Sequence, residues 1–293
     1  MPPGTTPAPD RNTKKPTFVP PPKTCDAHCH IFGPAHKFPY DPDASYHPPD
    51  SGFEQIVELH KILGIERAVI VHASCHGADM RATLDGIARS NGRFRGTAII
   101  DDTYTTADFD RMHEGGIRGV RFNFVKHLGG RPDFGLFHKT VDRLKALGWH
   151  LILHLDANDI VEFEDMFRKL PVPMVIDHMA RVSAKEGLDQ KPFKVLLDFL
   201  RDDKVWVKIC GSERVSSNGP PFHDAIPFAQ ALINVAPDRI LWGTDWPHPN
   251  VGKYMPNDGD LVDMIPLTMP DAAIRQKVLV ENPARLYGFR ATD

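Results

Sequence analysis

The chain has 293 residues, of which 41% are hydrophobic and 25% charged, and its 35 basic and 38 acidic residues leave a net charge of −3. These proportions are typical of a soluble globular protein, and without an excess of positive charge there is no field to attract a nucleic acid. The longest apolar runs, such as WHLILHL, are too short to cross a membrane, so we expect neither a nucleic-acid nor a membrane partner.

The N-terminal segment is rich in proline and lacks the apolar core of a secretory signal. We therefore expect a flexible Pro-rich arm over residues 1–22 and a single domain over residues 23–293. Cysteine is too sparse for a disulfide framework, which favours a reduced, cytoplasmic enzyme. The cysteines are Cys25, Cys29, Cys75 and Cys210.

After the arm, apolar stretches that predict strands alternate with amphipathic stretches that predict helices. The expected strands cover residues 23–30, 67–74, 95–100, 116–124, 149–157, 172–179, 204–212 and 239–247. The expected helices cover residues 53–64, 80–90, 105–116, 134–148, 159–170, 193–202 and 224–236, with a last one ending at residues 281–289. This alternation predicts an α/β fold, the (β/α)8 TIM barrel. A doubly wound sheet is the alternative, but no G-x-G-x-x-G motif follows the first strand.

Polar side chains that bind metal ions or anions end most of these strands. In chain order they are His28 and His30; His72, Ser74 and His76; Arg121 and Asn123; His154 and Asp156; Asp177, His178 and Arg181; Ser212 and Arg214; and Asp245. In a barrel these ends meet on one face, where active sites gather. A single such histidine is more often structural, but several imidazoles and one carboxylate at the same end suit Zn²⁺ or a related divalent ion.

The first strand shows the pattern most clearly. His28 and His30 are two residues apart, so their side chains point to the same side of the strand. Cys29 lies between them and must face the other way, which predicts a buried, inert thiol.

The H-x-H pair, the histidines after strands five and six and the aspartate after strand eight together resemble the amidohydrolase superfamily. The strings DAHCHIFGP, ASCHG, HEGGIRGVRFNFVK, VPMVIDHMAR, WGTDWPHPN and LVDMIP resemble the 2-pyrone-4,6-dicarboxylate lactonase group in particular. The resemblance extends from CDAHCH to NPARLYG, nearly the whole chain.

Two positions depart from that group, whose members work without a metal. His154 stands where the group has tyrosine, which restores a ligand of the metal-dependent superfamily members. His127 stands where the group has an arginine that would hold one substrate carboxylate. The resemblance therefore fits best the 4-sulfomuconolactone hydrolase type, which implies a zinc-dependent hydrolase of a small, anionic, unsaturated lactone from the catabolism of aromatic compounds.

This resemblance implies roles for the strand-end residues. His28, His30, His154 and Asp245 would bind one divalent metal ion, with Zn²⁺ expected, and Asp245 would also take the proton from the water that the metal activates. No lysine ends strand four, which argues against a second, bridged metal, and Lys208 on strand seven reads better as an ion-pairing residue. His178 would orient the water or polarise the lactone carbonyl, with a fifth ligand or a partner of Asp177 as the alternatives.

The expected partner is a small-molecule anionic lactone, and homo-oligomer formation stays open. Arg121 and Arg214 are the candidates for holding its carboxylate or sulfonate, because a guanidinium fork matches an oxyanion. Arg181 either contributes or pairs with Asp177. Further polar contacts are expected from Ser74, Asn123, Tyr46, His127 and Asn250.

Two other activities remain as alternatives. One is hydrolysis of 2-pyrone-4,6-dicarboxylate itself. The other is decarboxylation of the aminocarboxymuconate-semialdehyde type, whose enzymes carry the same set of histidines and aspartate; a barrel that only binds small anions is disfavoured by the intact metal set.

Overall fold

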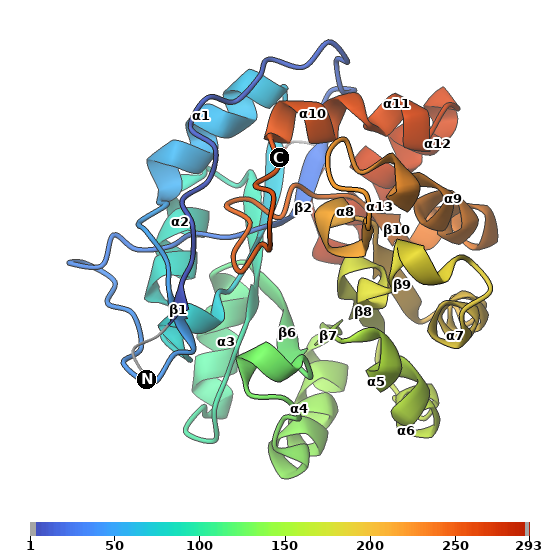
Figure 1. The fold of residues 1–293 in the computed structure, drawn as a ribbon. Helices are drawn as coiled ribbons and strands as arrows, with labels where there is room; N and C mark the ends of the chain where they lie inside the picture. Colours follow the sequence, from blue (N-terminus) through green and yellow to red (C-terminus); the bar gives the residue numbers. More distant parts are fainter. Residues whose placement is uncertain (1–3, 291–292) are drawn as a thin grey trace.

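Eight parallel strands form a barrel around which the helices are arranged (Figure 1). The structure, a computed structural model, describes residues 4–290 and 293. The strands follow the chain in order around the sheet: β2 (Cys25–Cys29), β4 (Arg67–Val71), β5 (Phe94–Ala98), β6 (Ile117–Asn123), β7 (His150–His154), β8 (Met174–Ile176), β9 (Val205–Lys208) and β10 (Ile240–Leu241). The predicted (β/α)8 barrel is confirmed.

The barrel closes where the segment after β10 meets β2. Ala27 N donates to Trp242 O at 2.9 Å, Asp245 N to His28 O at 2.8 Å and His30 N to Trp246 O at 2.8 Å. We call residues 242–246 and their hydrogen bonds to β2 the closing seam. It contains Asp245, so the same backbone bonds that close the barrel hold this carboxylate beside the two histidines of the first strand.

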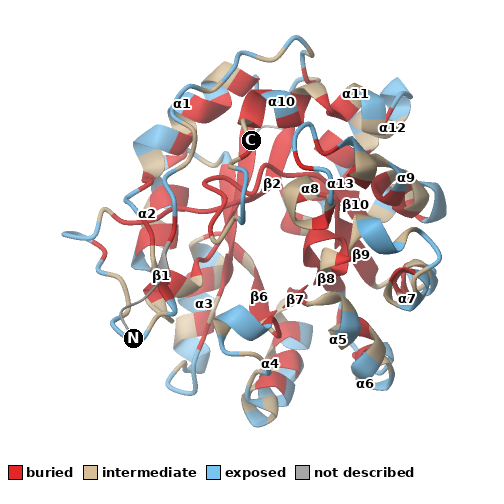
Figure 2. Cartoon of the chain, in the orientation of Figure 1, coloured by how far each residue is buried: buried red, intermediate tan, exposed pale blue. Residues whose placement is uncertain are grey.

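The α-helices of the described residues lie mostly on the outside of the barrel, where the longer ones turn apolar faces toward the strands. They are α1 (Phe53–Leu63), α2 (Arg81–Arg89), α3 (Thr106–Glu114), α4 (Phe134–Leu147), α5 (Ala157–Glu162), α6 (Glu164–Arg168), α7 (Lys191–Phe199), α8 (Ser212–Val215), α9 (Ile226–Val235), α10 (Asp258–Asp263), α11 (Ile265–Thr268), α12 (Ala272–Gln276) and α13 (Asn282–Tyr287). Figure 2 shows the strands buried and the outer helix surfaces exposed. None of these helices in the described ranges is long and apolar enough to span a bilayer.

Local sequence explains where the clearest helices stop. The last turns of α1 and α4 are followed by Gly64 and Gly148, whose φ values of 74° and 65° are left-handed. Glycine takes this conformation without a steric penalty, so it ends a helix well.

The eighth strand is much shorter than predicted. The sequence favours a strand over residues 239–247, whereas β10 ends at Leu241. Beyond it the chain turns, and Asp245 has a φ of 65°, which is incompatible with a strand. The apolar tryptophans that suggested a continuing strand are buried instead in the end of the barrel.

The N-terminal arm is fastened to the barrel at two places. Near its start, β1 (Gly4–Thr5) pairs in parallel with β3 (Tyr46–His47). Further along, Lys14 Nζ lies 2.7 Å from Asp260 and 3.0 Å from Asp263 on α10. The division of the chain at residue 22 stays a prediction.

Candidate active site

A polar cavity opens at the carboxyl ends of the barrel strands. It is lined by His30, Tyr46, Ser74, Arg121, His127, Leu128, His154, His178, Arg214, Asp245, Pro249 and Asn250. Most of the residues predicted from the sequence therefore meet here. Three of them, His28, Asn123 and Arg181, are not among its lining residues.

His28, His30 and Asp245 converge on one point. Asp245 Oδ1 lies 3.3 Å from His30 Nε2 and 3.5 Å from His28 Nε2. All three side chains are buried, and their ligand atoms are close enough together to hold one metal ion. The period-two arrangement of a strand brings the histidines to the same side, and the closing seam brings the carboxylate to them.

The hydrogen bond behind His30 leaves a lone pair pointing at that point. His30 Nδ1 lies 2.7 Å from the carbonyl oxygen of Val71, so Nδ1 carries the hydrogen and Nε2 is free to accept. His28 Nε2 and Asp245 Oδ1 have no hydrogen-bond partner although both are buried. Buried polar atoms without a hydrogen-bond partner are costly, and imidazole and carboxylate are ligands of divalent ions, so this set of residues fits a divalent metal.

The charges of the set also suit a metal ion. Burial, together with Lys208, lowers the pKa of His28 to about 4, so this imidazole is neutral near pH 7. Burial alone would raise the pKa of Asp245, but Arg214 and the neighbouring histidines hold it well below its ordinary value. Neutral imidazole and ionised carboxylate are the forms that bind metal.

The second oxygen of Asp245 is already occupied. Arg214 Nη2 lies 2.5 Å and Nε 2.9 Å from Asp245 Oδ2, and Nη2 also donates to Pro249 O at 2.9 Å. Arg214 also lines the cavity, as predicted for an anion-binding residue, but its ion pair with Asp245 could not be read from the sequence. It orients the carboxylate as well as facing the substrate space.

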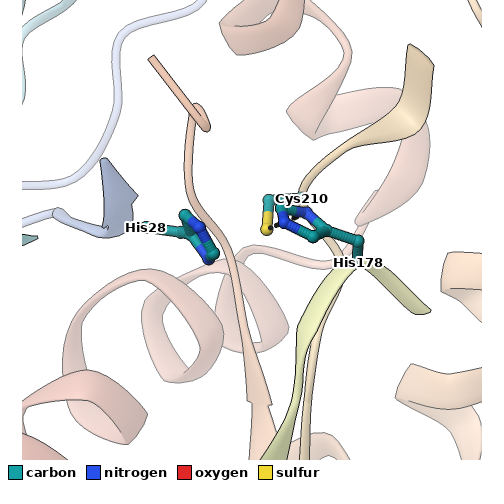
Figure 3. A group of neighbouring side chains, drawn as sticks. All are labelled: His28, His178 and Cys210. Atoms are coloured by element: carbon teal, nitrogen blue, oxygen red, sulfur yellow. Dashed lines mark hydrogen bonds between the residues drawn. The ribbon is translucent and has the colours of Figure 1, made fainter. Parts of the chain in front are cut away.

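His178 approaches the same point from the opposite wall. Its Nε2 lies 3.9 Å from Asp245 Oδ1, while its Nδ1 lies 3.3 Å from the sulfur of Cys210 (Figure 3). The partner on this nitrogen is therefore Cys210 and not Asp177. His28, His178 and Cys210 form a second group whose ligand atoms are close enough together to hold an ion.

An unusual turn presents His178. Four successive residues without glycine, 178–181, have φ values between 51° and 54°. Left-handed residues cost about 1–2 kcal/mol each, and they persist where the surrounding packing fixes them. His178, Met179 and Ala180 are buried, which supplies that constraint.

His154 faces the cavity beside this group without joining it. Its Nδ1 lies 3.0 Å from Asn123 Oδ1, and its Nε2 is buried without a partner. The ring centroid lies 5.4 Å from that of His178 and 6.2 Å from that of His127. None of the three-residue groups found among the described residues includes His154, so its predicted role as a ligand stays a prediction.

A buried ion-pair network underlies the floor of the site. Asp177 accepts from Arg121 Nε at 2.9 Å, and its other oxygen lies 3.2 Å from Lys208 Nζ and 3.4 Å from His28 Nδ1. Burial would raise the pKa of Asp177, but Lys208, His28 and Arg121 hold it well below its ordinary value. Lys208 is thus an ion-pairing residue, and its Nζ also lies 3.2 Å from His28 Nδ1, while Asp177 orients Arg121.

The remaining predicted contacts lie around the mouth. Tyr46 belongs to β3 and is buried, and Asn250 accepts a hydrogen bond from Thr6 Oγ1 of the arm at 3.3 Å. Arg181 pairs with Asp156, whose Oδ1 lies 3.2 Å from Arg181 Nε, rather than with Asp177. Burial lowers the pKa of His127 to about 4, and the neighbouring arginines act in the same direction.

Sequence reasoning missed the residues that support this site from behind. Asp26 and Thr244 adjoin predicted ligands but were not singled out, and neither was the buried pair of His248 and Asp258, whose side chains lie 3.1 Å apart. The available signal was position: Asp26, Thr244 and His248 each stand within three residues of a metal-binding candidate, and Asp258 lacks even that signal. That signal does not distinguish a supporting residue from a neighbour without a role.

Comparison with known proteins identifies the family of the chain. The amidohydrolase family profile matches residues 25–289. The chain belongs to the amidohydrolase family. The expectation of a hydrolase is confirmed.

Several amidohydrolases resemble this one over nearly their whole length. It is 42% identical to a 2-pyrone-4,6-dicarboxylate hydrolase of Comamonas testosteroni over 94% of this chain and 93% of the relative. It is 43% identical to a 4-sulfomuconolactone hydrolase of Hydrogenophaga intermedia over 92% of this chain and 90% of the relative. A crystal structure of an Agrobacterium tumefaciens protein superposes with a TM-score of 0.80 at 26% identity, covering 94% of this chain and 99% of that one.

Proposed function

We propose that this amidohydrolase is a metal-dependent lactone hydrolase that opens a small, anionic, unsaturated lactone of the 4-sulfomuconolactone type. The observation that carries the proposal is the convergence of His28 Nε2, His30 Nε2 and Asp245 Oδ1 in a cavity that Arg121 and Arg214 also line. A bound Zn²⁺ ion would lower the pKa of a water molecule and polarise the lactone carbonyl. The curated relatives support the lactone as the substrate class.

The residues of the chain divide the remaining work. Asp245 takes a proton from water as the water oxygen bonds to the lactone carbonyl carbon. The ring C–O bond then breaks, and the proton passes from Asp245 to the departing ring oxygen, so one water is consumed and an open-chain hydroxy or keto acid results. His178 faces the same point and steadies the carbonyl oxygen. Arg121 and Arg214 hold the anionic substituent.

Hydrolysis of 2-pyrone-4,6-dicarboxylate is the second candidate, because the Comamonas testosteroni relative of that name is as similar as the sulfomuconolactone hydrolase. The side chains at the substrate end favour the first candidate. The pKa of His127 is lowered to about 4, so near pH 7 it offers no fixed positive charge for a second carboxylate. We therefore expect the pyrone to be the poorer substrate.

The test compares both lactones on the same enzyme preparation. Purified protein is assayed as isolated, after chelation and after addition of Zn²⁺, with ring opening followed by absorbance and carbon dioxide measured in parallel. We expect faster turnover of 4-sulfomuconolactone, loss of activity on chelation, recovery with metal and no carbon dioxide. Full activity of metal-free protein would overturn the proposed metal dependence. A preference for the pyrone would make 2-pyrone-4,6-dicarboxylate hydrolysis the first candidate.

Metal content tests whether His154 is a metal ligand. Elemental analysis of His154→Asn beside His30→Asn, each purified without chelator, separates the two histidines. If His154 binds the metal, both variants lose it. If only His30→Asn does, His154 contacts the substrate or Asn123 alone.

A further inference from the structure

A second buried carboxylate lies directly behind the proposed metal ligands. Asp26 is fully buried, and it accepts hydrogen bonds from His28 N at 3.1 Å and from Thr244 N at 2.9 Å on Oδ1. Its Oδ2 accepts from Thr244 Oγ1 at 2.6 Å and lies 3.1 Å from His60 Nε2 of α1. Asp26 does not line the cavity, so every one of its contacts goes to the frame of the site.

The hydroxyl of Thr244 makes the link to Asp245. It donates to Asp26 and accepts a hydrogen bond from Trp246 N at 3.0 Å, so it fixes the residues on both sides of Asp245. The neighbouring Gly243 confirms how closely the two segments approach. A Cβ on Gly243 would lie 2.6 Å from His28 N and 2.9 Å from Asp26 Oδ1, closer than real Cβ atoms come.

The backbone of Asp245 needs such support. Its φ of 65° is left-handed, a conformation that residues other than glycine rarely adopt unless the surroundings impose it. Asp245 N donates to His28 O, which ties the strained residue to the H-x-H strand. The side chains of Asp26 and Thr244 make hydrogen bonds to the residues next to this backbone bond.

We propose that Asp26 and Thr244 form a positioning clasp that fixes the Asp245 carboxylate relative to His28 and His30. The clasp sets how well the three ligand atoms converge on a metal ion and how near Asp245 Oδ1 comes to the attacking water. The part of this inference that concerns catalysis rests on the proposed function. The part that concerns the backbone around Asp245 does not.

The experiment compares two substitutions at one position. Thr244→Val keeps the shape of the side chain but removes both hydrogen bonds, whereas Thr244→Ser keeps the hydroxyl. Removing a partner that orients a metal ligand typically lowers metal affinity or activity by about 10–100-fold. We expect Thr244→Val to lose that much Zn²⁺ affinity and kcat while KM changes less than threefold. Thr244→Ser should restore both to within a few-fold of wild type.

A matched control separates positioning from plain stability. Thr140 of α4 is also buried, and its hydroxyl donates to Leu136 O at 2.7 Å. Thr140 does not line the cavity. Thr140→Val removes a buried hydroxyl in the same way and should lower Tm while leaving Zn²⁺ affinity unchanged. If Thr140→Val weakens Zn²⁺ binding as much as Thr244→Val, the effect is general destabilisation and the clasp is refuted.

Amide hydrogen exchange reads the clasp without metal or substrate. In metal-free protein, loss of the Thr244 hydroxyl should speed exchange in peptides spanning residues 242–246, with other peptides unchanged, and Asp26→Asn should act in the same direction. Unchanged exchange in both variants, or equal impairment of Thr244→Ser and Thr244→Val, would overturn the clasp. Wild-type protein that neither binds Zn²⁺ nor opens a lactone would overturn the proposed function instead.

Discussion

The two oxygens of Asp245 have different neighbours, and this division suits the double role that we propose for it. Oδ2 is held by the Arg214 guanidinium, while Oδ1 faces His28, His30 and His178 without a hydrogen bond. The ion pair with Arg214 orients the carboxylate, and the open oxygen can take a proton or contact a metal. A substitution that changes charge but not shape should therefore separate catalysis from folding.

Asp245→Asn makes that change. The amide retains the size of the side chain, but it cannot accept a proton, so kcat should fall by about 10²–10⁴-fold. Steady-state kinetics gives the rate, and a thermal melt shows whether the fold survives. A kcat within a few-fold of wild type would assign the base to another residue.

Arg121 and Arg214 should differ when each is replaced by alanine. Arg121 contacts Asp177, which keeps Lys208 as a second cation, so Arg121→Ala should mainly raise KM through a lost substrate contact. Arg214→Ala also releases Asp245 and should lower kcat as well as raise KM. A hydrogen bond to a charged group contributes about 1.5–3 kcal/mol, or roughly 10- to 150-fold.

The measurement is kcat and KM for both variants on the preferred lactone, with Arg143→Ala on α4 as a control for loss of an arginine outside the cavity. Equal effects of Arg121→Ala and Arg214→Ala on kcat would contradict the special role of the Arg214–Asp245 pair. Unchanged KM in both would move the anion site elsewhere.

At the residue scale, the sequence predicts what depends on strand periodicity. His28 and His30 could be paired because alternate residues of a strand share a side, and the eight-unit pattern puts Asp245 at their end of the barrel. The partner of Arg214 could not be predicted, because it depends on how two loops fold against each other. The same is true of Cys210, which no motif marks as a neighbour of His178.

Among the elements, the N-terminal arm contacts residues that line the cavity. Its strand β1 pairs with β3, which carries Tyr46, and Thr6 reaches Asn250. Both Tyr46 and Asn250 line the cavity, so the arm supports two residues of its mouth. The ion pair between Lys14 and α10 lies further along the arm, so it would remain after removal of the start of the arm.

Deleting residues 2–9 should therefore raise KM while leaving kcat and Tm nearly unchanged. A neutral hydrogen bond contributes about 0.5–1.5 kcal/mol, so the expected rise is about 2- to 12-fold, and Thr6→Val should give the lower part of that range. KM on both lactones is the measurement. If neither variant changes KM, the arm does not shape the mouth.

Elements were predicted best where their ends are marked by ordinary signals. The helices that end at Gly64 and Gly148 were predicted to within a residue, since glycine follows each periodic stretch. The left-handed turn over residues 178–181 contains no glycine, so the sequence carries no signal that predicts it. It exists because tertiary packing overrides the local preference of these residues, and a single sequence does not record such packing.

At the scale of the whole molecule, buried histidines make stability depend on pH. Burial lowers the pKa of His72 and of His150 to about 3, against about 6.5 in an unfolded chain. Below pH 6.5 the unfolded state therefore binds more protons than the folded state, and stability falls as pH falls. His248, whose pKa Asp258 raises despite burial, acts in the opposite direction.

Tm should accordingly decrease between pH 7.5 and pH 4.5, with each buried neutral histidine contributing up to about 1.4 kcal/mol per pH unit. Thermal melts in matched buffers measure this slope. His150→Gln should make it shallower, whereas His138→Gln, at an exposed position on α4, should leave it unchanged. A Tm independent of pH over this range would mean that these histidines are not neutral in the folded protein.

The closing seam has a consequence for the order in which the molecule becomes functional. Thr244 and Asp26 lie 218 positions apart in the chain, so the first and last strands of the barrel meet only when nearly all of the polypeptide has been made. A nascent chain that ends before β10 contains His28 and His30 but lacks Asp245. It should therefore be inactive even where its helices have already formed. The return of activity during refolding would therefore report when the closing seam forms. If the chain were cut in an exposed loop, the two fragments would regain activity only by associating so that the closing seam forms between them.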